Sequence, residues 1–213
     1  GGARAVVVDA DRSTVWAWTG RTLLTLDFDG TRELTVPLDL PDLPATVHAG
    51  LVVRPEDGSV WLAAGRELRS LSAAGTPLAS RRVPETVVSL ALDPAADLLW
   101  VATAKSVAAH DAVSGAPLRS LDLGKNPDIR GLALAPEGGL WIALRDEARR
   151  IGADGALLQS LSARNLLALA AAPDGGAWLA SAKSLRRINA EGATLFTVEP
   201  FAGQGTISAL AAH

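Results

Sequence analysis

The 213-residue chain contains no cysteine, no methionine and no tyrosine, and only 4% of its residues are aromatic. Without cysteine it can form neither disulfides nor thiolate metal sites. Cysteine usage therefore does not indicate whether the protein works in an oxidising or a reducing compartment. No apolar run approaches the roughly 18 residues of a membrane-spanning helix, so we expect no membrane span. The formal net charge is −3, which is not the strongly basic balance typical of nucleic-acid-binding domains.

The few tryptophans are periodic. Five of the six recur, each after an apolar residue, at spacings of 37 to 45 residues. A period near 40 with one bulky aromatic residue indicates stacked supersecondary units that bury their apolar faces against one another. The five tryptophans are Trp16, Trp61, Trp100, Trp141 and Trp178.

Each period divides into short apolar runs. In the fourth, the runs are Gly131 to Ala135, Leu140 to Leu144, a third ending at Ile151, and Ala156 to Leu161. Runs of about five residues separated by Gly, Pro and Asp predict a four-stranded antiparallel meander rather than helices. The last turn contains a glycine in every period because a tight hairpin needs positive φ. These glycines are Gly30, Gly75, Gly115, Gly155 and Gly192.

Radial repetition of such a meander predicts an all-β fold, the β-propeller, whose units are blades. The strands are apolar on both faces, which fits a blade buried between two other blades. Every first strand has a small residue at one aligned position, which fits innermost strands crowded around a central axis. We predict one propeller domain over residues 1–213, or a fragment of a longer one, whose open blade edges allow oligomerisation. The expected blades 1 to 5 span about 3–38, 46–82, 85–123, 127–162 and 164–200, and an extra innermost strand spans 206–212.

The stretch "IRGLALAPEGGLWIALRDEARRIGADGALLQSL" (129–161) resembles the NHL-type repeat. It is also similar to the propeller repeats of bacterial two-component sensors and of streptogramin-lyase-like proteins. The resemblance implies a bacterial protein and slightly favours an extracytoplasmic location, although the sequence itself leaves the compartment unknown. These families include protein-binding and RNA-binding modules, sensors, lactonases and lyases, so the scaffold alone does not select an activity.

The resemblance to lactonases and lyases directs attention to the central mouth, where different blades bring metal-ligating side chains together. His48 lies two residues before Gly50, the small residue of its first strand. Arg130 directly precedes the small residue Gly131, and Arg4 directly precedes Ala5. We take these three as ligand-binding candidates, and His48 and Arg130 as the weak catalytic ones. The alternative for His48 is a structural role with local hydrogen bonds, and for the two arginines it is a surface position with the guanidinium group in solvent. No histidine pair has ligand spacing, so we expect neither a metal nor a cofactor.

Acidic pairs occur in "DADRS" (9–13) and "DFDG" (27–30). They partly match the first ligands of a calcium loop, but both lie on expected turns and lack the remaining ligands. We interpret them as turn-forming aspartates.

Basic residues gather at the turns between the second and third strands, one in each blade. Such a rim is a candidate for binding a polyanion, RNA or an acidic glycan, through salt-dependent contacts. Aromatic residues that would stack on bases are missing there, which favours solvated turns over a nucleic-acid site. The rim consists of Arg21, Arg66, Lys105, Arg145 and Lys183.

The sequence thus favours a non-catalytic scaffold that presents a face to a protein or a small ligand. The connections 37–47 and 199–205 are the segments expected to carry specificity. The alternatives are a lactonase- or lyase-like enzyme at the central mouth and polyanion binding on the basic rim.

Overall fold

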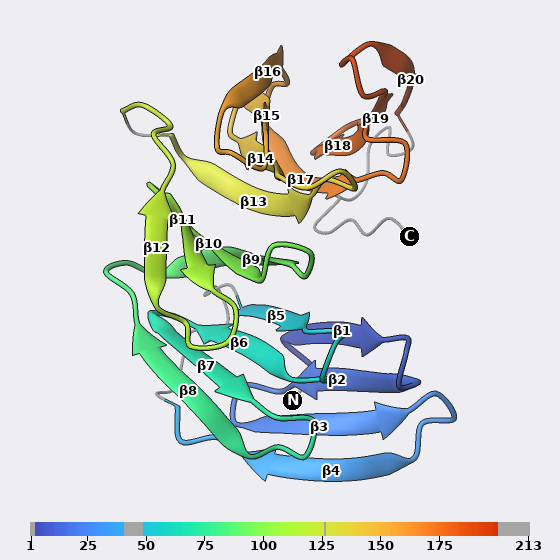
Figure 1. Ribbon diagram of the computed structural model, residues 1–213. Coiled ribbons are helices and arrows are strands. Elements are labelled where there is room, and N and C mark those ends of the chain that lie inside the picture. Colours follow the sequence, from blue (N-terminus) through green and yellow to red (C-terminus); the bar gives the residue numbers. More distant parts are fainter. Residues whose placement is uncertain (1–2, 41–48, 126, 200–213) are drawn as a thin grey trace. The chain divides into compact units, whose positions relative to one another are not determined.

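The computed structural model describes residues 3–40, 49–125 and 127–199 (Figure 1). The regular secondary structure in these ranges consists of β-strands. The all-β prediction is therefore confirmed. In the same ranges there is no helix long and apolar enough to cross a membrane. His48 and the predicted extra strand 206–212 lie outside the described residues, as do most of the two specificity-bearing connections.

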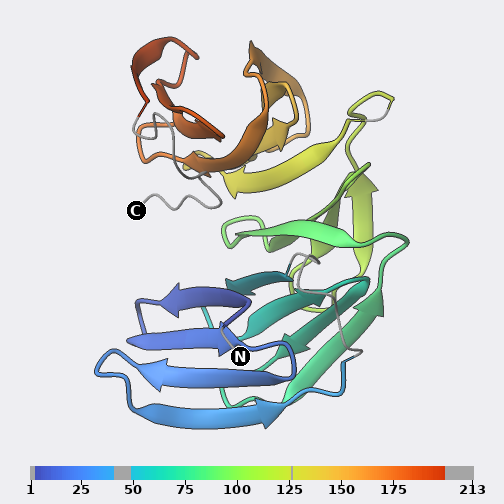
Figure 2. The same ribbon diagram turned by 180° about the vertical axis from the view of Figure 1, so that it is seen from behind.

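The chain divides into two compact units, which are described separately. The first comprises residues up to 103 together with 108–119, and the second comprises 104–107 and the residues from 120 onward. Among the described residues, the first unit has three four-stranded antiparallel sheets and the second has two, each with its strands in sequence order (Figures 1 and 2). Five four-stranded meanders were predicted, and the described residues form five.

The strands group into five blades, one for each sheet of the described residues. Blade 1 consists of β1 (Ala5–Asp9), β2 (Thr14–Trp18), β3 (Thr22–Asp27) and β4 (Arg32–Pro37). Blade 2 consists of β5 (Ala49–Val53), β6 (Val60–Ala64), β7 (Glu67–Leu71) and β8 (Pro77–Arg82). Blade 3 consists of β9 (Val87–Asp93), β10 (Leu98–Thr103), β11 (Val107–Asp111) and β12 (Pro117–Ser120). Blade 4 consists of β13 (Ile129–Leu134), β14 (Leu140–Leu144), β15 (Glu147–Ile151) and β16 (Leu157–Ser162). Blade 5 consists of β17 (Leu166–Ala171), β18 (Ala177–Ser181), β19 (Leu185–Ile188) and β20 (Thr194–Val198).

The hairpin between the third and fourth strands has the same backbone conformation in every blade. The five predicted glycines have φ between 69° and 90°, a region that other residues avoid. Gly115 is also constrained by packing, because a Cβ atom there would lie 2.5 Å from the Trp61 ring. Glycine is thus required at this turn by both conformation and space.

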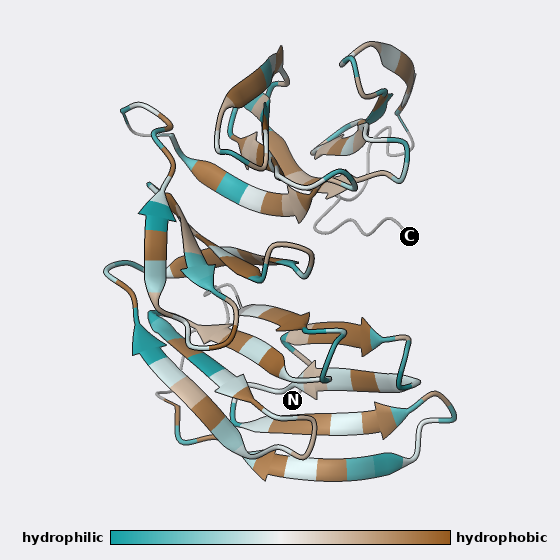
Figure 3. Ribbon diagram, in the orientation of Figure 1, coloured by the Kyte–Doolittle hydropathy of each residue, from teal (hydrophilic) through white to brown (hydrophobic). Residues whose placement is uncertain are grey.

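Four of the five periodic tryptophans are buried in their blades. Trp16, Trp61, Trp100 and Trp141 are at most 2% exposed. Trp178 is half-buried, and it packs edge-on against Phe196 with 5.4 Å between ring centroids. Figure 3 shows hydrophilic colour in many of the turns and at one end of each of the strands β4, β8 and β12.

Neighbouring blades of one unit meet through their first strands and through indole hydrogen bonds. In the first unit β1 contacts β5 and β5 contacts β9, and in the second β13 contacts β17. A Cβ atom at Gly50 would lie 2.8 Å from the Leu90 side chain, which explains a small residue at this position. The Trp141 indole N–H donates to the carbonyl of Gly175 in the next blade at 3.3 Å.

Replacing Trp141 by alanine should destabilise the protein by about 3 to 5 kcal/mol, because it empties a fully buried site at the centre of blade 4. Urea unfolding followed by circular dichroism measures the change. The same replacement at the half-buried Trp178 is the matched control, and it should cost clearly less. Equal costs at the two positions would contradict this packing.

Candidate functional site

The mouth candidates inside the described ranges are exposed and engaged with nearby groups. The Arg4 guanidinium carbon lies 5.9 Å from the centre of the Trp18 ring in its own blade. Arg130 donates to a carboxylate oxygen of Asp128 at 3.0 Å. Arg4 belongs to the first unit and Arg130 to the second, so each is described in its own surroundings. Their role in ligand binding stays a prediction.

The basic-rim residues lie at the turns between second and third strands, where the sequence places them. Arg66 donates its Nε–H to the carbonyl of Val83 at 3.1 Å, and Arg145 forms an ion pair with Asp128 at 2.7 Å. Arg21 and Lys105 are engaged as well. Part of the rim's positive charge is therefore already compensated, and polyanion binding stays a prediction.

The turn aspartates cap the backbone. One carboxylate oxygen each of Asp27 and Asp29 accepts the amide hydrogen of Thr31, both at 2.8 Å. The buried His110 has its Nδ1 atom 3.0 Å from the carbonyl oxygen of Gly115, a local contact within blade 3. In the part of the chain that the structure describes, no group of three or more His, Cys, Asp or Glu side chains is arranged to hold a metal ion.

Three arginines at one repeated position make the same contact. Each stands eight residues after the tryptophan of its blade, in the third strand. The three are Arg69 in β7, Arg149 in β15 and Arg186 in β19. Each donates from a terminal guanidinium nitrogen to a backbone carbonyl where the connection into its own blade begins. The acceptors are Asp39 at 2.7 Å, Leu123 at 2.9 Å and Ser162 at 3.0 Å. We refer to these three side chains as the connection arginines.

Each connection arginine also lines a cavity. The cavities have volumes of about 280 Å³ at Arg69, about 410 Å³ at Arg149 and about 510 Å³ at Arg186. The two larger ones lie in the second unit, each between the connection entering a blade and that blade's turn from second to third strand. A cavity therefore recurs beside each connection arginine, and the two larger ones have volumes typical of small-ligand sites.

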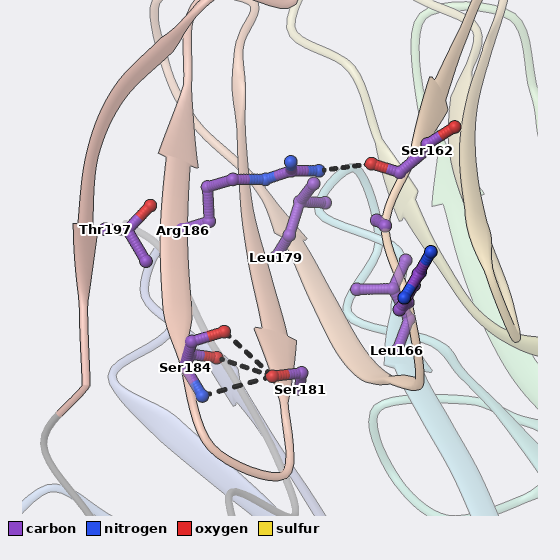
Figure 4. A pocket seen from close by; sticks show the side chains of 9 residues that line it. Ser162, Leu166, Leu179, Ser181, Ser184, Arg186 and Thr197 are labelled. Carbon is purple, nitrogen blue, oxygen red and sulfur yellow. Dashed lines mark hydrogen bonds between the residues drawn. The ribbon is translucent and has the colours of Figure 1, made fainter.

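The largest of these three cavities lies between blades 4 and 5, and Figure 4 shows Arg186 reaching across it from β19 toward Ser162. Its connection is fixed by the backbone, because the amides of Ala163 and Leu166 donate to the β14–β15 turn at 3.0 Å and 2.7 Å. The cavity walls are thus preformed. The lining residues are Ser162, Ala163, Arg164, Leu166, Leu179, Ser181, Ser184, Arg186 and Thr197.

The cavity at Arg149 has its charges compensated internally. The Arg149 guanidinium holds Glu147 through two bonds of 2.9 Å and 3.0 Å, and the hydrogen bond from Arg149 lowers the pKa of that carboxyl. Asp128 pairs with Arg145 in the same cavity. Here the connection arginine forms a two-bond ion pair with a carboxylate of its own strand, a strong and directional arrangement.

The sequence interpretation did not single out the connection arginines. It examined the turns and the entries to first strands, whereas these side chains come from third strands. Their signal was an arginine at a fixed distance from the periodic tryptophan. Their acceptors are backbone carbonyls, which have no sequence signature.

The sequence matches no protein-family model, and no curated protein sequence is significantly similar to it. Solved structures do match. A streptogramin B lyase superposes with a TM-score of 0.76 at 16% identity, over 93% of this chain and 68% of the lyase. A catalytically inactive virginiamycin B lyase from Staphylococcus aureus with quinupristin superposes with a TM-score of 0.81 at 15% identity, over 99% of this chain and 74% of that one.

The chain is a β-propeller. The predicted resemblance to streptogramin-lyase-like propellers is thereby confirmed for the fold. At 15% to 16% identity the likeness shows the fold alone and transfers no activity to the propeller described here.

The Glu147–Arg149 pair makes stability depend on pH. Because the folded-state pKa of Glu147 is lowered, its stabilisation is present above the unfolded value of 4.5 and is lost as the pH falls through the folded value. Replacing Glu147 by glutamine should cost about 1 kcal/mol near neutral pH. Urea unfolding of both proteins from neutral pH to about pH 3 should show this gap close on acidification. A gap independent of pH would contradict an ionic origin.

Proposed function

We propose that this propeller is a non-catalytic binding module that presents preformed cavities beside its blade connections to a small ligand or a protein segment. The observation that carries the proposal is the recurrence of one construction, a connection arginine that ties the incoming connection to its blade and lines a cavity there. A binding surface built this way loses little conformational entropy when it is occupied.

The chemistry of the largest cavity supports recognition rather than a reaction. Its polar groups are hydroxyls and guanidinium groups, with the apolar Leu166 and Leu179 beside them. A few directed polar groups on an apolar wall are typical of ligand sites. The half-buried Arg186 and the backbone-anchored connection hold these groups in place.

Backbone-amide NMR against a library of small molecules tests this proposal. We expect ligands to shift the amides of Leu166, Ser181 and Ser184, while the hairpins at Gly155 and Gly192 stay unchanged. Thr197→Trp should block the cavity and weaken such binding by about tenfold or more, roughly the loss of 1.4 kcal/mol. Thr194→Trp, an exposed change on the same strand outside the cavity lining, is the control. Ligand shifts centred on residues outside this cavity lining would overturn the proposal.

A second candidate is a lyase-like activity at the central mouth, favoured by the fold shared with the streptogramin B lyases. It would use His48 and Arg130. Because enzymes of very different function share propeller folds, we place this candidate second.

Incubation with quinupristin and a divalent metal, followed by mass spectrometry, separates the two candidates. The binding-module proposal predicts no product. Metal-dependent turnover that disappears in His48→Ala and persists in His110→Ala would establish the lyase instead. Arg130→Gln would then show whether this arginine contributes to turnover.

A further inference from the structure

We propose that the cavity between blades 4 and 5 is an oxyanion site, which binds the carboxylate, phosphate or sulfate group of a small molecule through Arg186, Arg164 and serine hydroxyls. This inference rests on the proposed function, since it names the ligand class of the same cavity. It follows from how this cavity differs from its counterpart in blade 4.

The difference is one residue at a repeated position. Six residues after the tryptophan, blade 4 has Glu147 and blade 5 has Ser184. In blade 4 the glutamate occupies the Arg149 guanidinium with two hydrogen bonds. In blade 5 the serine lines the cavity in its place, so the otherwise equivalent Arg186 lacks this internal anion.

The cavity has no carboxylate of its own. Its lining contains two arginines and no acidic residue, whereas the blade-4 lining has three basic and three acidic residues. Among the ion pairs of the described residues, none involves Arg164 or Arg186. A guanidinium group has five N–H donors, and the described hydrogen bonds of Arg186 use one, at Ser162. Its remaining donors are suited to an external oxyanion, which they can bind in a bidentate manner.

The serines supply a further donor. Ser181 Oγ accepts the amide hydrogens of Lys183 at 3.3 Å and Ser184 at 3.1 Å. With both lone pairs occupied, its own hydrogen is shared between the Ser184 carbonyl at 3.3 Å and the Ser184 Oγ at 2.9 Å (Figure 4). The hydroxyl hydrogen of Ser184 is thereby left to donate to a ligand. Thr197 stands opposite Arg186 on β20 and completes the hydroxyl-bearing wall.

Titration with inorganic phosphate, sulfate and acetate at low ionic strength tests the site, with calorimetry for affinity and amide NMR for location. The wild-type protein should bind at least one of them saturably, with shifts at Lys183 and Ser184. Acetate against phosphate and sulfate distinguishes a planar carboxylate from a tetrahedral group.

Ser184→Glu is the decisive variant, because it supplies the internal carboxylate that blade 4 already has. We expect it to weaken binding by about tenfold or more while the protein stays folded, as circular dichroism would show. Arg164→Gln should weaken binding as well without loss of fold, since that side chain is exposed. Arg81→Gln removes the same charge from an exposed site in blade 2 and should leave the affinity within about twofold.

Unchanged affinity in Ser184→Glu, or no saturable binding of any of the three anions to the wild-type protein, would overturn the oxyanion site. If neutral compounds from the library still shift the Ser181 and Ser184 amides in that case, the binding-module proposal stands and the ligand class alone is wrong. Equal weakening by Arg81→Gln would reduce the effect to net charge and also overturn the site.

Discussion

The hydrogen bond from a connection arginine to the first carbonyls of the incoming connection is the contact on which the candidate sites depend. Arg69, Arg149 and Arg186 each reach from the third strand of their blade to a backbone carbonyl where the connection begins. The donor is a charged group, which strengthens the bond, and the space beside it becomes a defined cavity. Backbone amides anchor the connection into blade 5 as well.

The same scaffold then acquires different chemistry through single substitutions near the arginine. With Glu147 beside it, Arg149 is compensated and its cavity is internally paired. With Ser184 in the equivalent place, Arg186 keeps its donors for a ligand. Fold and function are thus separable here: the periodic tryptophans and glycines build the blade, while the residue six positions after the tryptophan determines what the cavity can bind.

The architecture was predictable from sequence because it rests on local rules. Trp141 marks a blade centre through its spacing, and Gly155 marks a hairpin through the positive φ that the turn demands. The cavities were not predictable in the same way. Arg149 stands in a strand like any other charged residue, and its partner is a backbone carbonyl in a connection 26 residues earlier. The predicted mouth residue Arg130 lies in β13, and its contact with Asp128 depends on a backbone turn that spacing does not reveal.

Nitrogen NMR of the arginine side chains tests the central contact most directly. If the connection arginines are held by their carbonyl acceptors, Arg149 and Arg186 should show slow rotation of the guanidinium group, with separate terminal nitrogen signals and protected Nε–H protons. The exposed Arg81 provides the freely rotating reference in the same spectrum. Averaged terminal nitrogen signals for Arg149 and Arg186, indistinguishable from those of Arg81, would contradict the account.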